Sequence, residues 1–173
     1  MKNFQDSDDT SLVGGETKKT SLRIDAIGAL DELNASVGLA RAAINDKELK
    51  ATLTRISETI FSAGADLASL SGKGMITPSD IVKLEDAMKK AEAELPPLQN
   101  FILPGQTQDD ALLHSCRASA RKAERAFLRL SEKETTNREV FRYLNRLSDL
   151  FFALARLVNK RAGIEEHKWK NQA

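Results

Sequence analysis

The stretch from 113 to 130 contains the residues whose types and spacing could do chemistry. His114, Arg117, Arg121 and Glu124 recur at steps of three and four, so they share one face of a helix. An apolar stripe precedes this face by one position and consists of Leu113, Cys116, Ala120, Ala123, Phe127 and Leu130. Because solvated charges need no fixed spacing, guanidinium groups about 100° from a packed stripe indicate the wall of a cleft. Their planar forks suit phosphate, so the stretch predicts a site for an anion of this kind.

Other polar side chains lie on second faces of segments that otherwise carry packing stripes, namely Asp31, Asn34, Asn145 and Asp149. A solvated surface, or structural ion pairs such as Glu124 with an arginine, would produce the same pattern and stays open as an alternative. The sequence contains no Walker loop, no dinucleotide-binding glycine pattern and no Glu-x-x-His pair of a di-iron bundle. A single histidine in the stretch is a weak candidate for acid–base chemistry. The spacing alone therefore leaves the reaction undefined.

The composition is that of a globular domain. With 173 residues, 41% of them hydrophobic and 29% charged, the chain can form one domain with a sizeable core. Lys and Arg number 26 against 25 Asp and Glu, which removes the global electrostatic case for nucleic acid or an anionic membrane. No apolar run could span a bilayer and the start lacks a secretory signal, so we expect a cytoplasmic protein. The only cysteine, Cys116, is predicted to pack in the core, and two histidines with one cysteine cannot form a Cys/His metal cluster.

Five helical segments are predicted, and no stretch after the first dozen residues alternates with period two. They span residues 22–45, 47–70, 78–95, 107–131 and 137–161. Apolar stripes mark their buried faces, for example Leu33, Ile60, Leu84, Met88, Leu113 and Leu147. Thr77 and Thr107 supply N-caps, and Pro96 with Pro97 ends the third segment. Long helices with such stripes predict an all-α, single-domain bundle of five helices, with a four-helix up-down core plus one helix.

The chain divides into an N-terminal segment (1–21), a helical bundle (22–162) and a polar tail (163–173). The tail contains the only tryptophan, Trp169; we expect it to be loosely held, and its sequence gives no indication of function. The connection at 98–105 is apolar where loops are normally polar. Its phenylalanine, Phe101, is therefore expected to be buried against another part of the protein.

Four blocks in this order resemble the signature blocks of the PduO-type ATP:cob(I)alamin adenosyltransferase family. They are residues 28–34 (GALDELN), 101–105 (FILPG), 117–125 (RASARKAER) and 143–149 (YLNRLSD). The resemblance extends from Thr10 to Arg156 and implies a homotrimer of five-helix subunits with ATP and corrin clefts between neighbours. It also implies transfer of the 5′-deoxyadenosyl group of ATP to the cobalt of cob(I)alamin, with release of triphosphate. An electron-donating reductase and an adenosylcobalamin-dependent enzyme would be its protein partners.

The resemblance assigns roles residue by residue. The residues that match ATP-binding positions are Thr10, Ser11, Lys19, Arg121, Lys122, Glu124, Arg125 and Asn145. Arg121 would neutralise charge that grows on the triphosphate, with Mg²⁺ accompanying the nucleotide. Asp31 and Arg117 match a pair that bridges two subunits and fixes the cleft. Phe101 matches the aromatic residue that lies below the corrin and displaces its lower nitrogen ligand.

The N-terminal segment departs from the family pattern. Gln5 and Asp8 occupy positions where the family has the glycines of a phosphate-binding loop. A glycine allows the backbone to approach an anion, whereas an aspartate brings negative charge to a place meant for triphosphate. Lys19 aligns only after a one-residue gap, and Lys122 replaces a second arginine. An active enzyme with weakened ATP binding is the first hypothesis, and a degenerate homologue that binds or delivers cobalamin without efficient transfer is the alternative.

Overall fold

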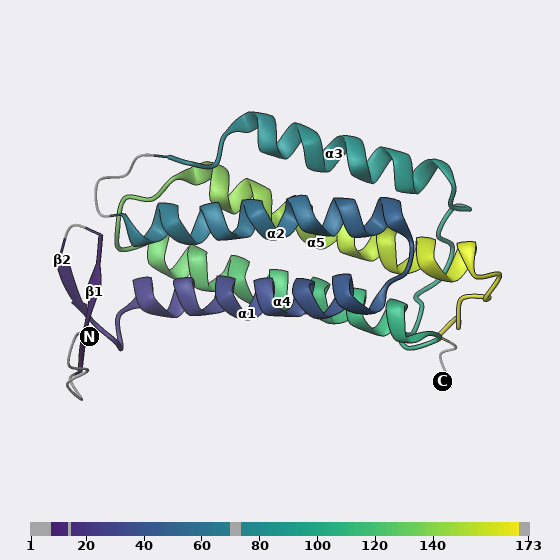
Figure 1. Ribbon diagram of the computed structural model, residues 1–173, viewed down its shortest axis with the longest axis horizontal. Helices are drawn as coiled ribbons and strands as arrows, with labels where there is room; N and C mark the ends of the chain where they lie inside the picture. The colour runs from purple at the N-terminus through teal and green to yellow at the C-terminus, as the bar shows by residue number, and fades with distance from the viewer. Residues whose placement is uncertain (1–7, 14, 70–73, 170–173) are drawn as a thin grey trace.

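Five helices form the body of the computed structural model, and a short hairpin precedes them (Figure 1). The structure describes residues 8–13, 15–69 and 74–169. The helices are α1 (Leu22–Ala43), α2 (Lys47–Ala68), α3 (Pro78–Ala93), α4 (Gln108–Ser131) and α5 (Arg138–Arg161). Their bounds agree with the predicted segments to within two residues, so the all-α bundle is confirmed.

Polar side chains at the N-caps explain where the helices begin. Ser21 accepts a hydrogen bond from the Ile24 N–H group, and Asn137 accepts one from the N–H group of Glu139. The hydroxyl of Thr107 accepts from the Asp110 N–H group at 3.1 Å, as predicted from the sequence. Each bond satisfies a backbone donor that has no partner inside its helix, which fixes the first turn.

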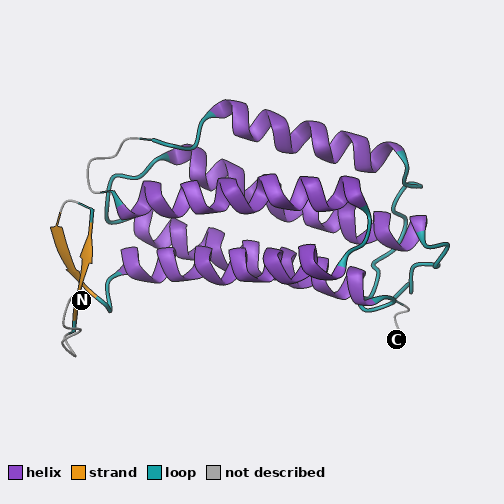
Figure 2. Ribbon diagram, viewed as in Figure 1, coloured by secondary structure: helices purple, strands orange, loops and turns teal. Residues whose placement is uncertain are grey.

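The helices run up and down along one long axis. α1 packs on α2 and α4, α4 packs on α5, and α3 lies along α5 (Figures 1 and 2). Nearly all of the predicted stripe residues are in the core, where Leu33, Leu113 and Leu147 have no exposed surface. Met88 on α3 is only half-buried. Because such a core is close-packed, the polar side chains on the outer faces of α1, α4 and α5 stand on a rigid support. No helix in the described ranges is long and apolar enough to cross a membrane.

A hairpin that the sequence did not predict lies ahead of α1. Strands β1 (Asp9–Leu12) and β2 (Gly15–Lys18) are antiparallel, with Thr10 opposite Thr17. Each strand has four residues and buries neither face fully, so it carries no apolar alternation that could be recognised. The N–H group of Val13 donates to the carbonyl oxygen of Ala68 at 3.1 Å and docks the hairpin on the end of α2.

The two ends of the bundle differ in what they carry. The hairpin and the α4–α5 connection lie at one end, and the α3–α4 connection and the C-terminal segment lie at the other (Figure 1). α4 runs from the second end to the first, so its residues between 117 and 125 lie between the two. The fold thus places the basic stretch midway between the N-terminal segment and the Phe101 loop.

Candidate functional site

The basic face of α4 is exposed along the bundle. Arg121, Lys122 and Arg125 are exposed, and Arg117 is half-buried. Lys122 Nζ lies 2.5 Å from a carboxylate oxygen of Glu32 on α1. Within the described residues, no carboxylate forms an ion pair with Arg121 or Arg125. Two guanidinium groups without counter-charges are therefore available to an anionic ligand.

Glu124 on this face is bound to α5 rather than to an arginine. Its Oε1 atom accepts a hydrogen bond from the Asn145 amide at 3.0 Å. The structural ion pair of Glu124 with an arginine, considered above, is therefore absent from the described residues. Asn34 does not join this group, because its Oδ1 atom accepts from the Ser57 hydroxyl of α2 at 2.6 Å. Asp149 pairs with Arg146 at the surface, at 3.3 Å.

Arg117 lies over an aromatic ring in the middle of α4. Its guanidinium carbon is 5.8 Å from the centre of the Phe152 ring, which is a cation–π geometry. The His114 ring meets the same phenylalanine edge-on at 5.9 Å. Phe152 follows Phe151 of the predicted α5 stripe and lies three residues after Asp149, which is on the outer face. In the sequence, only this spacing from Asp149 indicates that Phe152 reaches the same face. The aromatic ring holds Arg117 at the edge of the core.

The predicted pair of Asp31 and Arg117 is not formed within one chain. Asp31 is exposed on α1, and the Arg117 Nε atom is buried without a hydrogen-bond acceptor in the described part of the chain. A buried guanidinium nitrogen without an acceptor is unfavourable by about 1 to 3 kcal/mol. Within the described residues of a single subunit, the Asp31 carboxylate and the Arg117 Nε atom therefore both lack a partner.

His114 is buried and bound to a carboxylate. Its Nε2 atom lies 3.1 Å from Asp110 Oδ1, which places the ring proton on Nε2. Burial holds the pKa of His114 below its ordinary value of 6.5; the Asp110 carboxylate opposes this shift and the Arg117 charge adds to it. The ring is therefore neutral near pH 7, and its basic Nδ1 atom is buried without a hydrogen-bond partner in the described residues, which makes it a weak and poorly accessible base. Burial also raises the pKa of the Cys116 thiol to about 12, in agreement with its predicted packing role.

The lowered pKa of His114 predicts a pH dependence of stability. Protonation is less favourable in the folded chain than in the unfolded one, so the contribution of His114 to the free energy of unfolding is present above about pH 6.5 and is lost as the pH falls below it. His114→Gln should remove this part of the decline, measured as the difference in thermal midpoint between about pH 7.5 and pH 5.5. His167→Gln, which removes an exposed imidazole, is the matched control. An equal change in both variants would contradict the assignment.

The predicted nucleotide-loop residues lie on or beside the hairpin. Thr10 and Ser11 belong to β1, and Lys19 follows β2, where its N–H group donates to the Asp8 carbonyl oxygen at 2.8 Å. Asp8 is exposed, and Gln5 lies outside the described residues. Thr10, Ser11 and Lys19 thus lie at the hairpin end of the bundle, and the α3–α4 connection, which contains Phe101, lies at the opposite end (Figure 1). A ligand that contacted both ends would extend along the basic face of α4.

Phe101 is not buried, contrary to the expectation from its sequence context. Its side chain is 80% exposed, on a connection that runs over the end of the bundle. The tail is also not loose between 164 and 169, because the Trp169 N–H group donates to the Phe101 carbonyl oxygen at 2.8 Å. The backbone of the connection pairs with this segment instead of folding onto the core, which leaves the phenylalanine ring at the surface.

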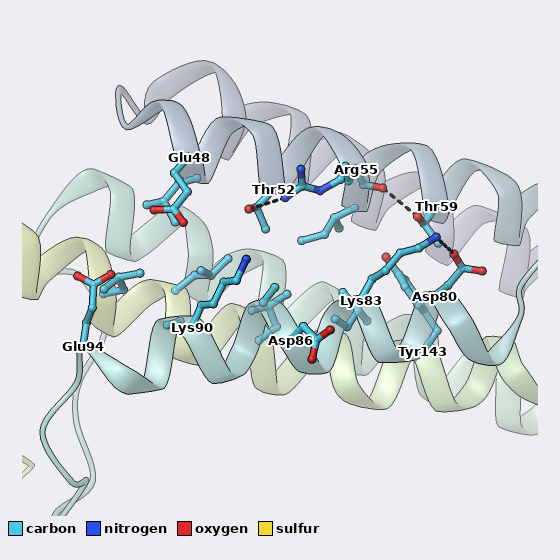
Figure 3. Close-up of a pocket in the computed structure, with 18 of the residues that line it drawn as sticks. Glu48, Thr52, Arg55, Thr59, Asp80, Lys83, Asp86, Lys90, Glu94 and Tyr143 are labelled. Carbon is cyan, nitrogen blue, oxygen red and sulfur yellow. Dashed lines mark hydrogen bonds and ion pairs between the residues drawn. The ribbon is translucent and has the colours of Figure 1, made fainter.

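Two cavities lie near the surface of the described part of the bundle, and of the candidate polar residues named above only Asp149 lines one of them. A hollow of about 590 Å³ lies between α3 and α5, where Pro97, Leu98 and Phe152 contribute to its wall. A cavity of about 360 Å³ lies between α2, α3 and α5, with Thr52, Arg55, Lys83 and Lys90 along its rims (Figure 3). The first adjoins the Phe101 connection. The second lies on α2 and α3, away from the basic face of α4.

Comparison with known proteins gives a consistent result. The sequence profile of the cobalamin adenosyltransferase family matches residues 3–158. The chain is 41% identical to the corrinoid adenosyltransferase of Bacillus subtilis, over 97% of this chain and 90% of the relative. It is 38% identical to the cobalamin adenosyltransferase of Cupriavidus metallidurans, over 92% and 86% of the two chains.

Solved structures agree with the sequence comparison. A variant PduO-type ATP:corrinoid adenosyltransferase from Lactobacillus reuteri, complexed with cobalamin and ATP, superimposes with a TM-score of 0.90 and 32% identity. The match covers 95% of this chain and 92% of that one. A second variant of the same protein, complexed with ATP, superimposes with a TM-score of 0.89, again at 32% identity, and covers 94% of this chain and 95% of that one.

Proposed function

The chain belongs to the cobalamin adenosyltransferase family, and on that premise we propose that the basic face of α4 binds ATP while Phe101 meets the corrin. The protein is an ATP:corrinoid adenosyltransferase: it transfers the 5′-deoxyadenosyl group of ATP to cob(I)alamin and releases triphosphate. The observation that carries the assignment of the site is the pair of exposed guanidinium groups on α4, Arg121 and Arg125, which have no carboxylate partner among the described residues.

The reaction needs little from the protein beyond alignment and charge. Cobalt(I) is the nucleophile: the cobalt–carbon bond forms at C5′, the C5′–oxygen bond breaks, and its electron pair leaves on the triphosphate. No side chain has to remove a proton, which agrees with a face where His114 is buried and already bound to Asp110. Charge grows on the leaving triphosphate, so fixed cations that contact it stabilise the transition state more than the ground state. Arg121 is our candidate for this role, with Lys122, Glu124, Arg125 and Asn145 binding the nucleotide.

The positions of the candidate residues along the bundle support a position for each ligand. Thr10, Ser11 and Lys19 lie at the hairpin end, together with the later turns of α4. The α3–α4 connection, which contains Phe101, lies at the other end. We therefore place the triphosphate toward the hairpin, the corrin toward Phe101 and C5′ between them. Close positioning of the two reacting atoms is the main rate factor in such a site.

A homotrimer with its sites between subunits explains the unused groups of Asp31 and Arg117. Asp31 is exposed and unpaired within the described chain, and Arg117 is oriented by Phe152 with one nitrogen unsatisfied. A neighbour's copy of each residue would complete the pair. Mg²⁺ would enter on the triphosphate oxygens, since the described residues contain no group of three or more side chains that could hold it. We also propose that the protein is cytoplasmic and that a reductase and an adenosylcobalamin-dependent enzyme are its protein partners.

A direct assay tests the assignment. The purified protein is supplied with ATP, Mg²⁺ and chemically reduced cobalamin, and the light-sensitive absorbance of adenosylcobalamin is followed together with triphosphate release. We expect both products in equal amounts. Corrin binding without either product would favour the alternative, a degenerate homologue that delivers cobalamin, which the altered N-terminal loop motivates.

The N-terminal departures predict weakened ATP binding. Replacing both Gln5 and Asp8 by glycine should tighten the dissociation constant for ATP by about fivefold, since one unit charge near another in water costs about 1 kcal/mol. Asp25→Gly, which changes an exposed aspartate on the first turn of α1, controls for the loss of one surface charge. Equilibrium dialysis with labelled ATP measures the change. Unchanged affinity in the double variant would show that these positions do not contact the phosphates.

A further inference from the structure

Buried charges fix both ends of the connection between α3 and α4. At its start, Arg156 of α5 is only 7% exposed and donates to the Pro96 carbonyl oxygen at 2.9 Å. At its end, the Asp110 carboxylate, which is 1% exposed, accepts from the N–H groups of Gly105 and Gln106 at 2.9 and 2.8 Å. Gly105 has φ of +97°, a conformation in which only glycine is unstrained. Both ends of the connection are therefore held by buried groups, and water cannot easily replace the hydrogen bonds that they form.

The segment after α5 holds the middle of the connection. The Leu103 N–H group donates to the His167 carbonyl oxygen at 2.8 Å, and the Trp169 N–H group donates to the Phe101 carbonyl oxygen at the same distance. Both strands of this short ladder lie at the surface. The two bonds flank Ile102, which pairs with Lys168, and one of them uses the Phe101 carbonyl oxygen, so the backbone is held directly after Phe101.

One guanidinium group binds the connection and the C-terminal segment together. Arg156 Nε lies 2.6 Å from Glu166 Oε1, while another nitrogen of the same side chain donates to Pro96. The Arg156 side chain is 8% exposed and that of Glu166 is 22% exposed. Removing one partner of such a pair would leave a charge with little solvent to replace it. The C-terminal segment is thus fastened beside Phe101 by a largely buried ion pair.

The Phe101 side chain itself is the exception in this rigid assembly. It is 80% exposed, and its ring meets the Trp169 ring edge-on, with centroids 6.4 Å apart and an angle of 79° between planes. In the free chain, this backbone pairing contributes nothing to the packing of an exposed phenylalanine ring. The constraint is useful when a ligand has to meet the ring at one height and one angle.

We propose that residues 164–169 form a positioning element for adenosyl transfer, in which Arg156, Glu166 and Trp169 hold the Phe101 ring where it displaces the lower nitrogen ligand of the cobalt. This inference rests on the proposed function, because it takes Phe101 to lie below the corrin. The three residues act through Phe101 and make no contact with the reacting atoms. Misplacement of a positioned group by about 1 Å lowers rates by roughly 10- to 100-fold.

The test compares two substitutions outside the hydrophobic core. Trp169→Ala removes the ring that meets the Phe101 ring edge-on. Glu166→Gln removes the negative charge that pairs with Arg156. Both should lower kcat roughly 10- to 100-fold with little change in KM for ATP. Trp169→Phe keeps an aromatic edge and should recover most of the rate. In Glu166→Gln the emission of the single tryptophan should also shift to longer wavelength as the segment loosens.

A spectroscopic readout separates positioning from general stability. Electron paramagnetic resonance of cob(II)alamin with ATP detects the splitting of the cobalt lines by the axial nitrogen. Wild-type protein should abolish this splitting, and both variants should retain it. Glu134→Gln is the matched control, because Glu134 pairs with the buried Arg23, which also donates to the Leu67 carbonyl oxygen, at the hairpin end of the bundle. It should destabilise the fold without restoring the splitting.

The outcomes distinguish this inference from the proposed function. If wild-type protein forms no adenosylcobalamin and leaves the splitting intact, the proposed function itself fails. If wild-type protein is active but Trp169→Ala and Glu166→Gln abolish the splitting as well as it does, the positioning role is wrong. Retention of the splitting in Glu134→Gln to the same degree as in Glu166→Gln would also overturn it, because the effect would then be loss of stability alone.

Discussion

Arg121→Ala should lower kcat for adenosyl transfer by roughly 100- to 1000-fold, the loss typical of removing one group that stabilises charge developing in a transition state. The side chain is exposed on α4 and has no carboxylate partner in the described residues, so its removal should leave the fold intact. The KM for ATP should rise much less than kcat falls, because the charge on the bridging oxygen appears only as the C5′–oxygen bond breaks. Initial rates of adenosylcobalamin formation, measured at several ATP concentrations, separate the two parameters.

The control for this prediction lies on another helix. Arg55→Ala removes an exposed arginine from α2, on the side of the bundle away from the basic face of α4. It changes the net charge of the chain by the same amount and should alter kcat less than twofold or so, as distant surface substitutions do. If Arg121→Ala raised KM for ATP as much as it lowered kcat/KM, with kcat unchanged, the residue would bind ATP equally in both states and would not stabilise the leaving group.

The helices were predictable because their signals are local. Stripe positions such as Leu33, Ile60 and Leu147 repeat at the helical period, and the N-cap Thr107 stands where α4 begins. The hairpin was missed because four-residue strands with no buried face depend on backbone pairing, and pairing partners leave little trace in side-chain type. The two glycines at 14 and 15 were the only turn signal.

The site was predictable only in part, for a related physical reason. The spacing of Arg117, Arg121 and Glu124 placed them on one face, and the structure agrees. The sequence could not reveal that Phe101 is exposed. An apolar loop residue that packs against the core and one that binds a ligand have the same sequence pattern. The spacing also could not reveal the ion pair of Arg156 with Glu166. Glu166 lies beyond the end of α5, so their contact depends on how the chain turns after this helix.

Asp31→Ala should weaken association of the subunits by about 3 to 5 kcal/mol, the loss expected when one partner of a buried ion pair is removed. Within one chain the same substitution should be nearly neutral, because Asp31 is exposed and no contact to it is found in the described residues. The two expectations differ enough for one experiment to separate them. Sedimentation velocity over a dilution series measures the association, and thermal unfolding at high dilution measures the stability of the separated chain.

The neighbouring residue provides the control, and a double variant tests the partner. Glu32→Ala breaks a pair with Lys122 in which both side chains are more than half exposed, so it should change association by less than about 1 kcal/mol. Arg117→Ala should weaken assembly as Asp31→Ala does, and combining the two should add little, because the second substitution removes a group whose partner is already gone. Additive losses would place Asp31 and Arg117 in separate contacts. Unchanged association in Asp31→Ala would mean that no neighbour reaches this face, and the nucleotide site would then have to be completed by a single chain.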